Sequence, residues 1–241
     1  MLPWYTYHGS IFVKINFKIM KLKIIYSFEN DLQRIVDTID KFDWFKEKGY
    51  NVDFPPSINV AKIKEYSKQD IFELLKGNWN DEEYKKTERQ IKENWQKYSE
   101  IFERDLIAVK LKPAEEYTAV LTLYGVGGSF NTKENKIILN VSYLLRKPNR
   151  SIMAIILHEI VHINVDGYIQ QNKVPHELKE KIVDMIMKKF FANDFSQEEF
   201  LQKWLYSKSF SEKAEVIFDN FYPNIERAIQ ELSKQMMSDN I

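Results

Sequence analysis

The stretch H-E-I-V-H at residues 158–162 decides how the rest of the chain is interpreted. His158 and His162 stand four residues apart, so on a helix they share one face and can converge on one ion. Glu159 lies about 100° round that helix, where it reaches a water in the open position of a metal more easily than the metal itself. A helical His-Glu-x-x-His pattern is typical of a zinc site with a base beside it.

The segment around this motif is apolar on nearly every side, with Ile152, Met153, Ile155, Ile156, Leu157, Ile160, Val161, Ile163 and Val165. A helix of this kind is expected at the centre of a core, where two imidazoles and a carboxylate would be costly without partners or a metal. Its apolar run is about fifteen residues, fewer than the roughly 20 that a membrane span needs. The sequence therefore predicts a core helix and no membrane partner.

The composition disfavours some classes of function and excludes some kinds of metal site. The 241 residues are 44% hydrophobic, and Lys plus Arg equals Asp plus Glu at 35 each, so no global field favours nucleic acid. There is no cysteine, so any metal site must be built from His, Asp and Glu. Lysines interrupt the apolar pattern of residues 11–26, which is unlike a signal peptide, and a cytoplasmic location is expected.

The order of expected elements suits an α+β fold in one domain, 1–241. Residues 1–105 form a possible N-terminal subdivision, and residues 106–241 form the expected catalytic part. Strands are expected within 11–26, unless Met20 is the natural start, and three strand-like runs at 106–111, 117–124 and 136–141 indicate an antiparallel unit. That unit precedes the motif helix and could offer a sheet edge to an extended peptide. Helices are expected at about 81–104, after Pro175, at about 196 and near Pro223.

The helix after Pro175 carries Glu180 and Asp184 at i and i+4, on one face. With them the chain resembles the gluzincin, or thermolysin-like, zinc metallopeptidases, in which the motif is followed on a second helix by Glu and, four residues later, Asp. The match covers about residues 150–190. The resemblance implies a zincin-like fold, with a small antiparallel or mixed sheet followed by the active-site helix and C-terminal helices. It also implies Zn²⁺ on His158, His162 and Glu180, with Glu159 as base and Asp184 orienting His158. Glu177 is the rival third ligand.

The expected activity is hydrolysis of peptide or protein substrates by a metal-activated water, with Glu159 as general base. Members of the family also use a Tyr or His that donates to the oxyanion, and His176 and Tyr168 are the nearby candidates. The alternative is a metal-binding regulatory or interaction protein with little or no peptidase activity. The sequence does not specify the cleavage preference or the oligomeric state.

Overall fold

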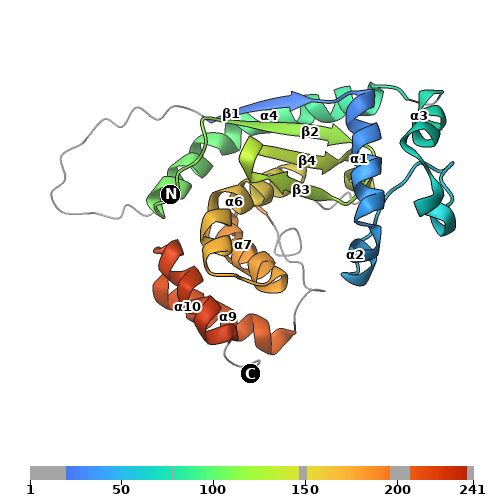
Figure 1. The fold of residues 1–241 in the computed structure, drawn as a ribbon. Helices are drawn as coiled ribbons and strands as arrows, with labels where there is room; N and C mark the ends of the chain where they lie inside the picture. Colours follow the sequence, from blue (N-terminus) through green and yellow to red (C-terminus); the bar gives the residue numbers. More distant parts are fainter. Residues whose placement is uncertain (1–19, 78, 147–150, 196–206, 238–241) are drawn as a thin grey trace.

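A computed structural model describes residues 20–77, 79–146, 151–195 and 207–237. The fold is mixed α+β and mostly helical, with one small four-stranded mixed sheet (Figure 1). The strand expected before Met20 and the helix expected at about 196 lie wholly or mainly outside the described residues.

The sheet has the strand order β1-β2-β4-β3, where the strands are β1 Lys21–Ile25, β2 Glu116–Thr122, β3 Gly128–Asn131 and β4 Lys136–Asn140. The first three strands in that spatial order run parallel, and β3 is antiparallel to β4 at the edge. Because β1 pairs directly with β2, residues from both sides of position 105 share this sheet.

The antiparallel unit predicted from three strand-like runs is wrong in two respects. Residues 106–111 form no strand, because α4 (Glu82–Ala108) continues through Leu106 and a turn at Lys110 follows, with φ of 63°. In addition, β2 and β4 are parallel. The segment between them contains β3, which turns back onto β4 through Asn135 in the left-handed region. One extra strand reverses the chain once more, so β4 runs in the direction of β2.

The N-terminal helices form a small second core with the 3₁₀ segment η1. It is built from α1 Phe28–Asp40, α2 Phe42–Glu47, η1 Val60–Glu65 and α3 Lys68–Lys76. Ser27 caps α1 and Ser67 caps α3 in a capping box, since each hydroxyl accepts a backbone N–H of the first turn. Buried Asp31 joins this unit to the sheet, because its carboxylate accepts from Tyr84, from Trp79 Nε1 at 3.0 Å and from Leu123 N at 3.1 Å.

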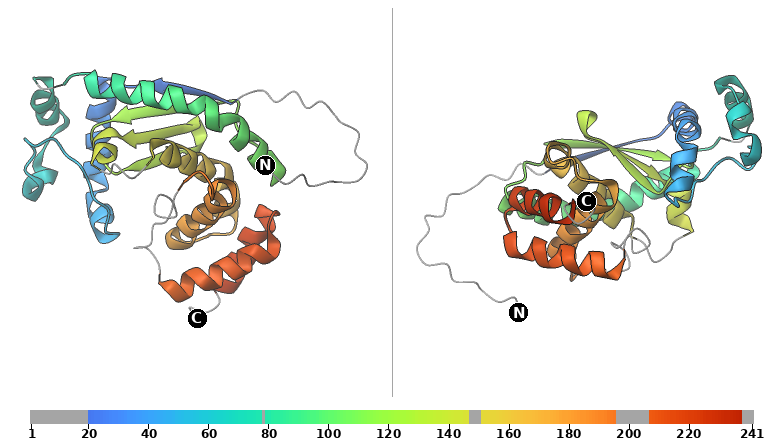
Figure 2. Two further views of the ribbon diagram at one scale, coloured as in Figure 1. Left: turned by 180° about the vertical axis from the view of Figure 1, so that it is seen from behind. Right: turned by 60° about the horizontal axis from the view of Figure 1, so that its bottom comes forward.

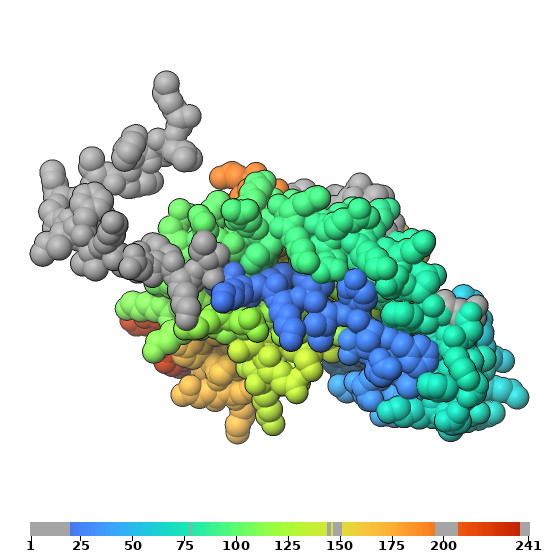
Figure 3. Space-filling view, turned by 90° about the horizontal axis from the view of Figure 1, so that it is seen from above, coloured from blue at the N-terminus to red at the C-terminus, as the bar shows by residue number. Residues whose placement is uncertain are grey.

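The long helix α4, predicted from its charge pattern, lies beside β1. The indole Nε1 of Trp95 donates to Met20 O at 3.1 Å, and the Tyr26 hydroxyl donates to Glu88 at 3.1 Å. Figure 3 looks onto this edge of the molecule, where α4 in green runs beside β1 and α1 in blue.

The remaining helices are α5 Val141–Leu145, α6 Ile152–Gln171, α7 His176–Phe191, α9 Lys208–Phe221 and α10 Ile225–Met237, and α4 shares one core with α6 and α7. Helix α6 packs on β3 and β4, α7 packs on α6, and the α9–α10 pair lies beyond them (Figures 1 and 2). Among the described helices, α6 alone is long and apolar enough to cross a membrane, but two thirds of that window (67%) is buried inside the protein. The predicted core helix is confirmed.

Candidate metal centre

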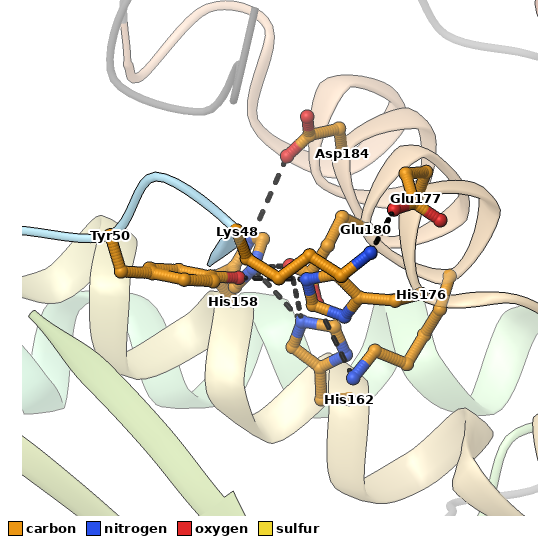
Figure 4. Close-up of polar contacts among 9 residues, drawn as sticks. Lys48, Tyr50, His158, His162, His176, Glu177, Glu180 and Asp184 are labelled. Carbon is orange, nitrogen blue, oxygen red and sulfur yellow. Dashed lines mark hydrogen bonds and ion pairs between the residues drawn. The ribbon is translucent and has the colours of Figure 1, made fainter. Parts of the chain in front are cut away.

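Three potential ligands from two helices point at one position (Figure 4). His158 and His162 lie on α6, which Ser151 caps by accepting from Met153 N at 3.2 Å, and Glu180 lies on α7. The two Nε2 atoms are 3.0 Å apart, and Oε2 of Glu180 is 3.2 Å from that of His162 and 3.5 Å from that of His158. All three residues are buried.

These spacings fit a tetrahedral metal. Bonds of about 2.0–2.1 Å from one zinc ion place its ligand atoms about 3.3 Å from one another. The three observed distances, 3.0, 3.2 and 3.5 Å, bracket that value. The group can therefore hold a metal ion through two imidazoles and one carboxylate, which are donors that suit zinc.

Burial and the neighbouring charges shift the pKa values of all three residues of the triad. Burial acts to lower the pKa of His158, but Glu180, Glu159 and Asp184 outweigh it and the pKa is raised. Burial lowers the pKa of His162 to about 4, so this imidazole is neutral at pH 7. Burial also acts to raise the pKa of Glu180, yet the two histidines hold it well below its usual value. In the metal-free site, Glu180 and His158 therefore each stabilise the charged form of the other.

Glu159 lies against the start of edge strand β3 and lines the same pocket as the triad. Burial raises the pKa of its carboxyl group to about 7, while His158, Lys179 and Arg34 act to lower it. A side chain on Gly128 would collide with this carboxylate, since a Cβ there would be 2.4 Å from Glu159 Oε1. Glycine lets the strand and the carboxylate approach this closely, because a side chain here would displace the Glu159 carboxylate.

The other predicted residues fall into two groups. Asp184 Oδ1 lies 3.7 Å from His158 Nδ1, on the ring edge away from the triad, and His176 Nδ1 lies 3.7 Å from Glu180 Oε1. Glu177 points elsewhere, to Lys48 Nζ at 2.9 Å, and is not among the described residues that line the pocket. Tyr168 packs against the main core and does not line the pocket either.

Tyr50 is a pocket residue that sequence analysis missed. Its hydroxyl is 2.9 Å from Nε2 of His176 (Figure 4). Its ring stacks on Trp44. Burial, with the nearby carboxylates of Glu180 and Glu159, raises the pKa of the phenol, so the hydroxyl keeps its proton. No signal in the sequence marks Tyr50, because it lies in a short loop far from the motif and belongs to no recognisable pattern.

The loop that carries Tyr50 is held against the sheet by hydrogen bonds of Asp53. Asp53 and Gly125 exchange two backbone hydrogen bonds at 2.8 and 2.9 Å, and Asn140 Nδ2 donates to the Asp53 carboxylate at 2.7 Å. Gly125 has φ of 88°, and a Cβ there would meet the buried Arg34 side chain at 2.4 Å. The glycine segment between β2 and β3 thus anchors Tyr50 on one side and meets Glu159 on the other.

Together these parts enclose a pocket of about 320 Å³. One wall comes from α2 and the loop after it, with Trp44 42% exposed. The opposite wall is the 126–130 segment, which includes most of edge strand β3, and the floor is α6 with the triad. The volume and the mixture of aromatic and polar lining residues suit a peptide segment or a small molecule.

Comparison with known proteins found no match to this chain among protein-family models, curated proteins or solved structures.

Proposed function

We propose that this chain is a zinc-dependent metallopeptidase of the zincin type, with a site that resembles that of gluzincins. The observation that carries the proposal is the triangle of His158 Nε2, His162 Nε2 and Glu180 Oε2, at spacings that suit tetrahedral zinc, with the Glu159 carboxylate in the same pocket. Three protein ligands leave a fourth position for water, as in catalytic zinc sites. Zinc bound there would lower the pKa of that water and polarise the substrate carbonyl.

Glu159 is the proposed general base. Its carboxylate takes a proton from the attacking water and delivers it to the departing amine nitrogen, so one group serves both halves of the reaction. Burial raises the pKa of the Glu159 carboxyl group to about 7, and a bound zinc ion would act to lower it, so the group would be ionised and able to accept the proton.

The Tyr50 hydroxyl is the proposed donor to the developing oxyanion, with His176 as the residue that orients it. A protonated phenol 2.9 Å from an imidazole can turn its hydrogen toward a substrate oxygen while the ring nitrogen holds it in place. Removing one such donor from an oxyanion site typically costs about 10²–10³ in rate.

The peptide itself is proposed to add to strand β3. This strand pairs only with β4 among the described strands, so its outer edge is open to an extended chain. The Glu159 carboxylate lies against the face of β3 at Gly128, so a peptide bond held opposite Gly128 would be close to the base.

The test uses purified protein, metal analysis and a matched substitution. The proposal expects one zinc per chain and hydrolysis of an unfolded protein such as casein. Glu159→Gln is expected to keep the zinc while losing at least about 10²-fold in rate, since only the proton transfer is removed. Full hydrolysis by Glu159→Gln would refute the mechanism. Stoichiometric zinc with no hydrolysis by either protein would favour a metal-binding regulatory protein.

A further inference from the structure

Lys179 is the only lysine or arginine among the described residues that line the pocket. Its Nζ is 3.4 Å from Glu180 Oε1 and 5.3 Å from the centre of the Phe130 ring. The side chain is 21% exposed and is part of the pocket lining. An ammonium group has three N–H donors, and one carboxylate oxygen at 3.4 Å does not use them all.

The place of Lys179 along β3 is defined by Phe130. That ring stacks on His162, with centroids 4.8 Å apart and planes 9° from parallel. Phe130 is two residues beyond Gly128, the glycine that meets Glu159. Two residues of strand span about 6.6 Å. A peptide lying along β3 with its scissile bond near Glu159 therefore places a group one or two residues away beside Lys179.

The charges of the pocket residues indicate which kind of substrate group would lie beside Lys179. Glu159 and Glu180 are the only Asp or Glu residues among the described lining residues. A divalent ion on the triad would offset these two carboxylates, and the ammonium group of Lys179 would then be the unbalanced charge among the described lining residues; Asp184, behind His158, does not line the pocket. In this partly buried setting, a substrate carboxylate gains a charge-assisted hydrogen bond, whereas a substrate ammonium is repelled.

We propose that Lys179 binds a carboxylate of the substrate, so that the site selects peptides with an acidic group one or two residues from the scissile bond. The group is either the side chain of Asp or Glu or the free C-terminal carboxylate of the peptide. This inference rests on the proposed peptidase function and deepens it by naming a substrate class.

The first part of the test measures which residues are enriched near the cleavage sites. Zinc-loaded protein digests a mixed peptide library, cleavage sites are mapped by mass spectrometry, and Glu159→Gln supplies the background. The proposal expects carboxylates enriched at one fixed position in the wild type and in Lys179→Arg, and no enrichment in Lys179→Met. Lys189→Met is the matched control, because Lys189 lies on the same helix with a carboxylate at 2.9 Å and an aromatic ring at 5.3 Å, away from the pocket.

The second part measures binding without turnover. Peptides that differ only by Glu or Gln at the enriched position, each with a free or amidated C-terminus, are titrated into zinc-loaded Glu159→Gln protein. We expect the carboxylate form to bind about 10- to 100-fold tighter, as for a hydrogen bond to a charged group, and the added Lys179→Met change to abolish that difference. The Glu/Gln and acid/amide pairs distinguish the two sources of the carboxylate.

Three results would overturn the inference: cleavage with no carboxylate preference, a preference that survives Lys179→Met, or equal weakening of Glu and Gln peptides by Lys179→Met. The last would assign the lysine to support of Glu180 alone. Absence of any Glu159-dependent cleavage is a different result, because it refutes the proposed function as well.

Discussion

The identity of the third ligand can be tested by comparing Glu180→Gln with Glu177→Gln. Both residues lie on the first turns of α7, three positions apart, and each substitution removes one charge with little change in size. Glu180 Oε2 lies 3.2 Å from His162 Nε2 and 3.5 Å from His158 Nε2, whereas Glu177 Oε1 lies 2.9 Å from Lys48 Nζ. The structure therefore predicts that only Glu180→Gln changes zinc binding.

The size of the effect follows from linkage. Free zinc at a thousand times its Kd stabilises the folded protein by about 4.1 kcal/mol, which for 150–250 residues raises Tm by about 8–16 °C. If loss of a ligand weakens binding about a hundredfold, the same zinc concentration contributes about 1.4 kcal/mol, or about 3–6 °C. Glu177→Gln loses a partly exposed ion pair, which has a small effect that is the same with and without zinc.

The assay is thermal unfolding of each protein with EDTA and with buffered free zinc, and the quantity compared is the zinc-induced rise in Tm. Taking that difference removes any direct effect of the substitution on the metal-free fold. The assignment would be refuted if Glu180→Gln kept the full rise, or if Glu177→Gln lost it. In either case the ligand triangle would not describe the bound state.

Three further outcomes are expected. Gly128→Ala should lose at least about tenfold in hydrolysis with zinc retained, because its Cβ would displace the Glu159 carboxylate, while Gly167→Ala on α6, with nothing within 4 Å, should keep full activity. Zinc affinity, measured by competition with a coloured chelator, should fall about tenfold per pH unit below the raised pKa of His158, since the metal must displace that proton; a flat profile would contradict the proton assignment. Asp184→Asn should weaken zinc binding by about 10- to 100-fold in the same assay, and an unchanged Kd would show that the 3.7 Å approach does not support the ligand.

Local patterns were sufficient to predict most helices of the fold. The apolar segment 152–165 became the core of α6, and the charged segment from about 81 became α4, because both carry a helical period over many residues. The strand predicted at residues 106–111 was wrong because an apolar run of this length also suits a helix end and the turn after it. Its buried members are Leu106, Val109 and Leu111. A short apolar run does not distinguish a strand from a helix terminus.

The relative direction of the strands could not be predicted from local sequence patterns. The reversal at β3 depends on a four-residue strand with two non-β-forming residues, Gly128 and Asn131, and such a segment has almost no strand signal. Its pairing with β4 is fixed instead by the turn at Asn135 and by packing on α6. The direction of β4 relative to β2 follows from that one pairing.

The candidate site shows the same division between local and distant information. The spacing of His158, His162, Glu180 and Asp184 within two consecutive helices is a local property, and the structure brings all four together. Tyr50 reaches the pocket only because other parts of the chain hold its loop, and no periodicity or motif records such contacts.

The loop around Tyr50 also explains why the pocket depends on the whole described fold. Lys48 pairs with Glu177 on α7, the helix that carries Glu180, and Asp53 pairs with the glycine segment that meets Glu159. One short loop is thus tied both to the helix that carries the proposed third ligand and to the segment that contacts the proposed base. A shift of either element would move the Tyr50 hydroxyl relative to the triad. The N-terminal residues therefore do more than cover a candidate site within 150–190, because they form one wall of the pocket and set its geometry.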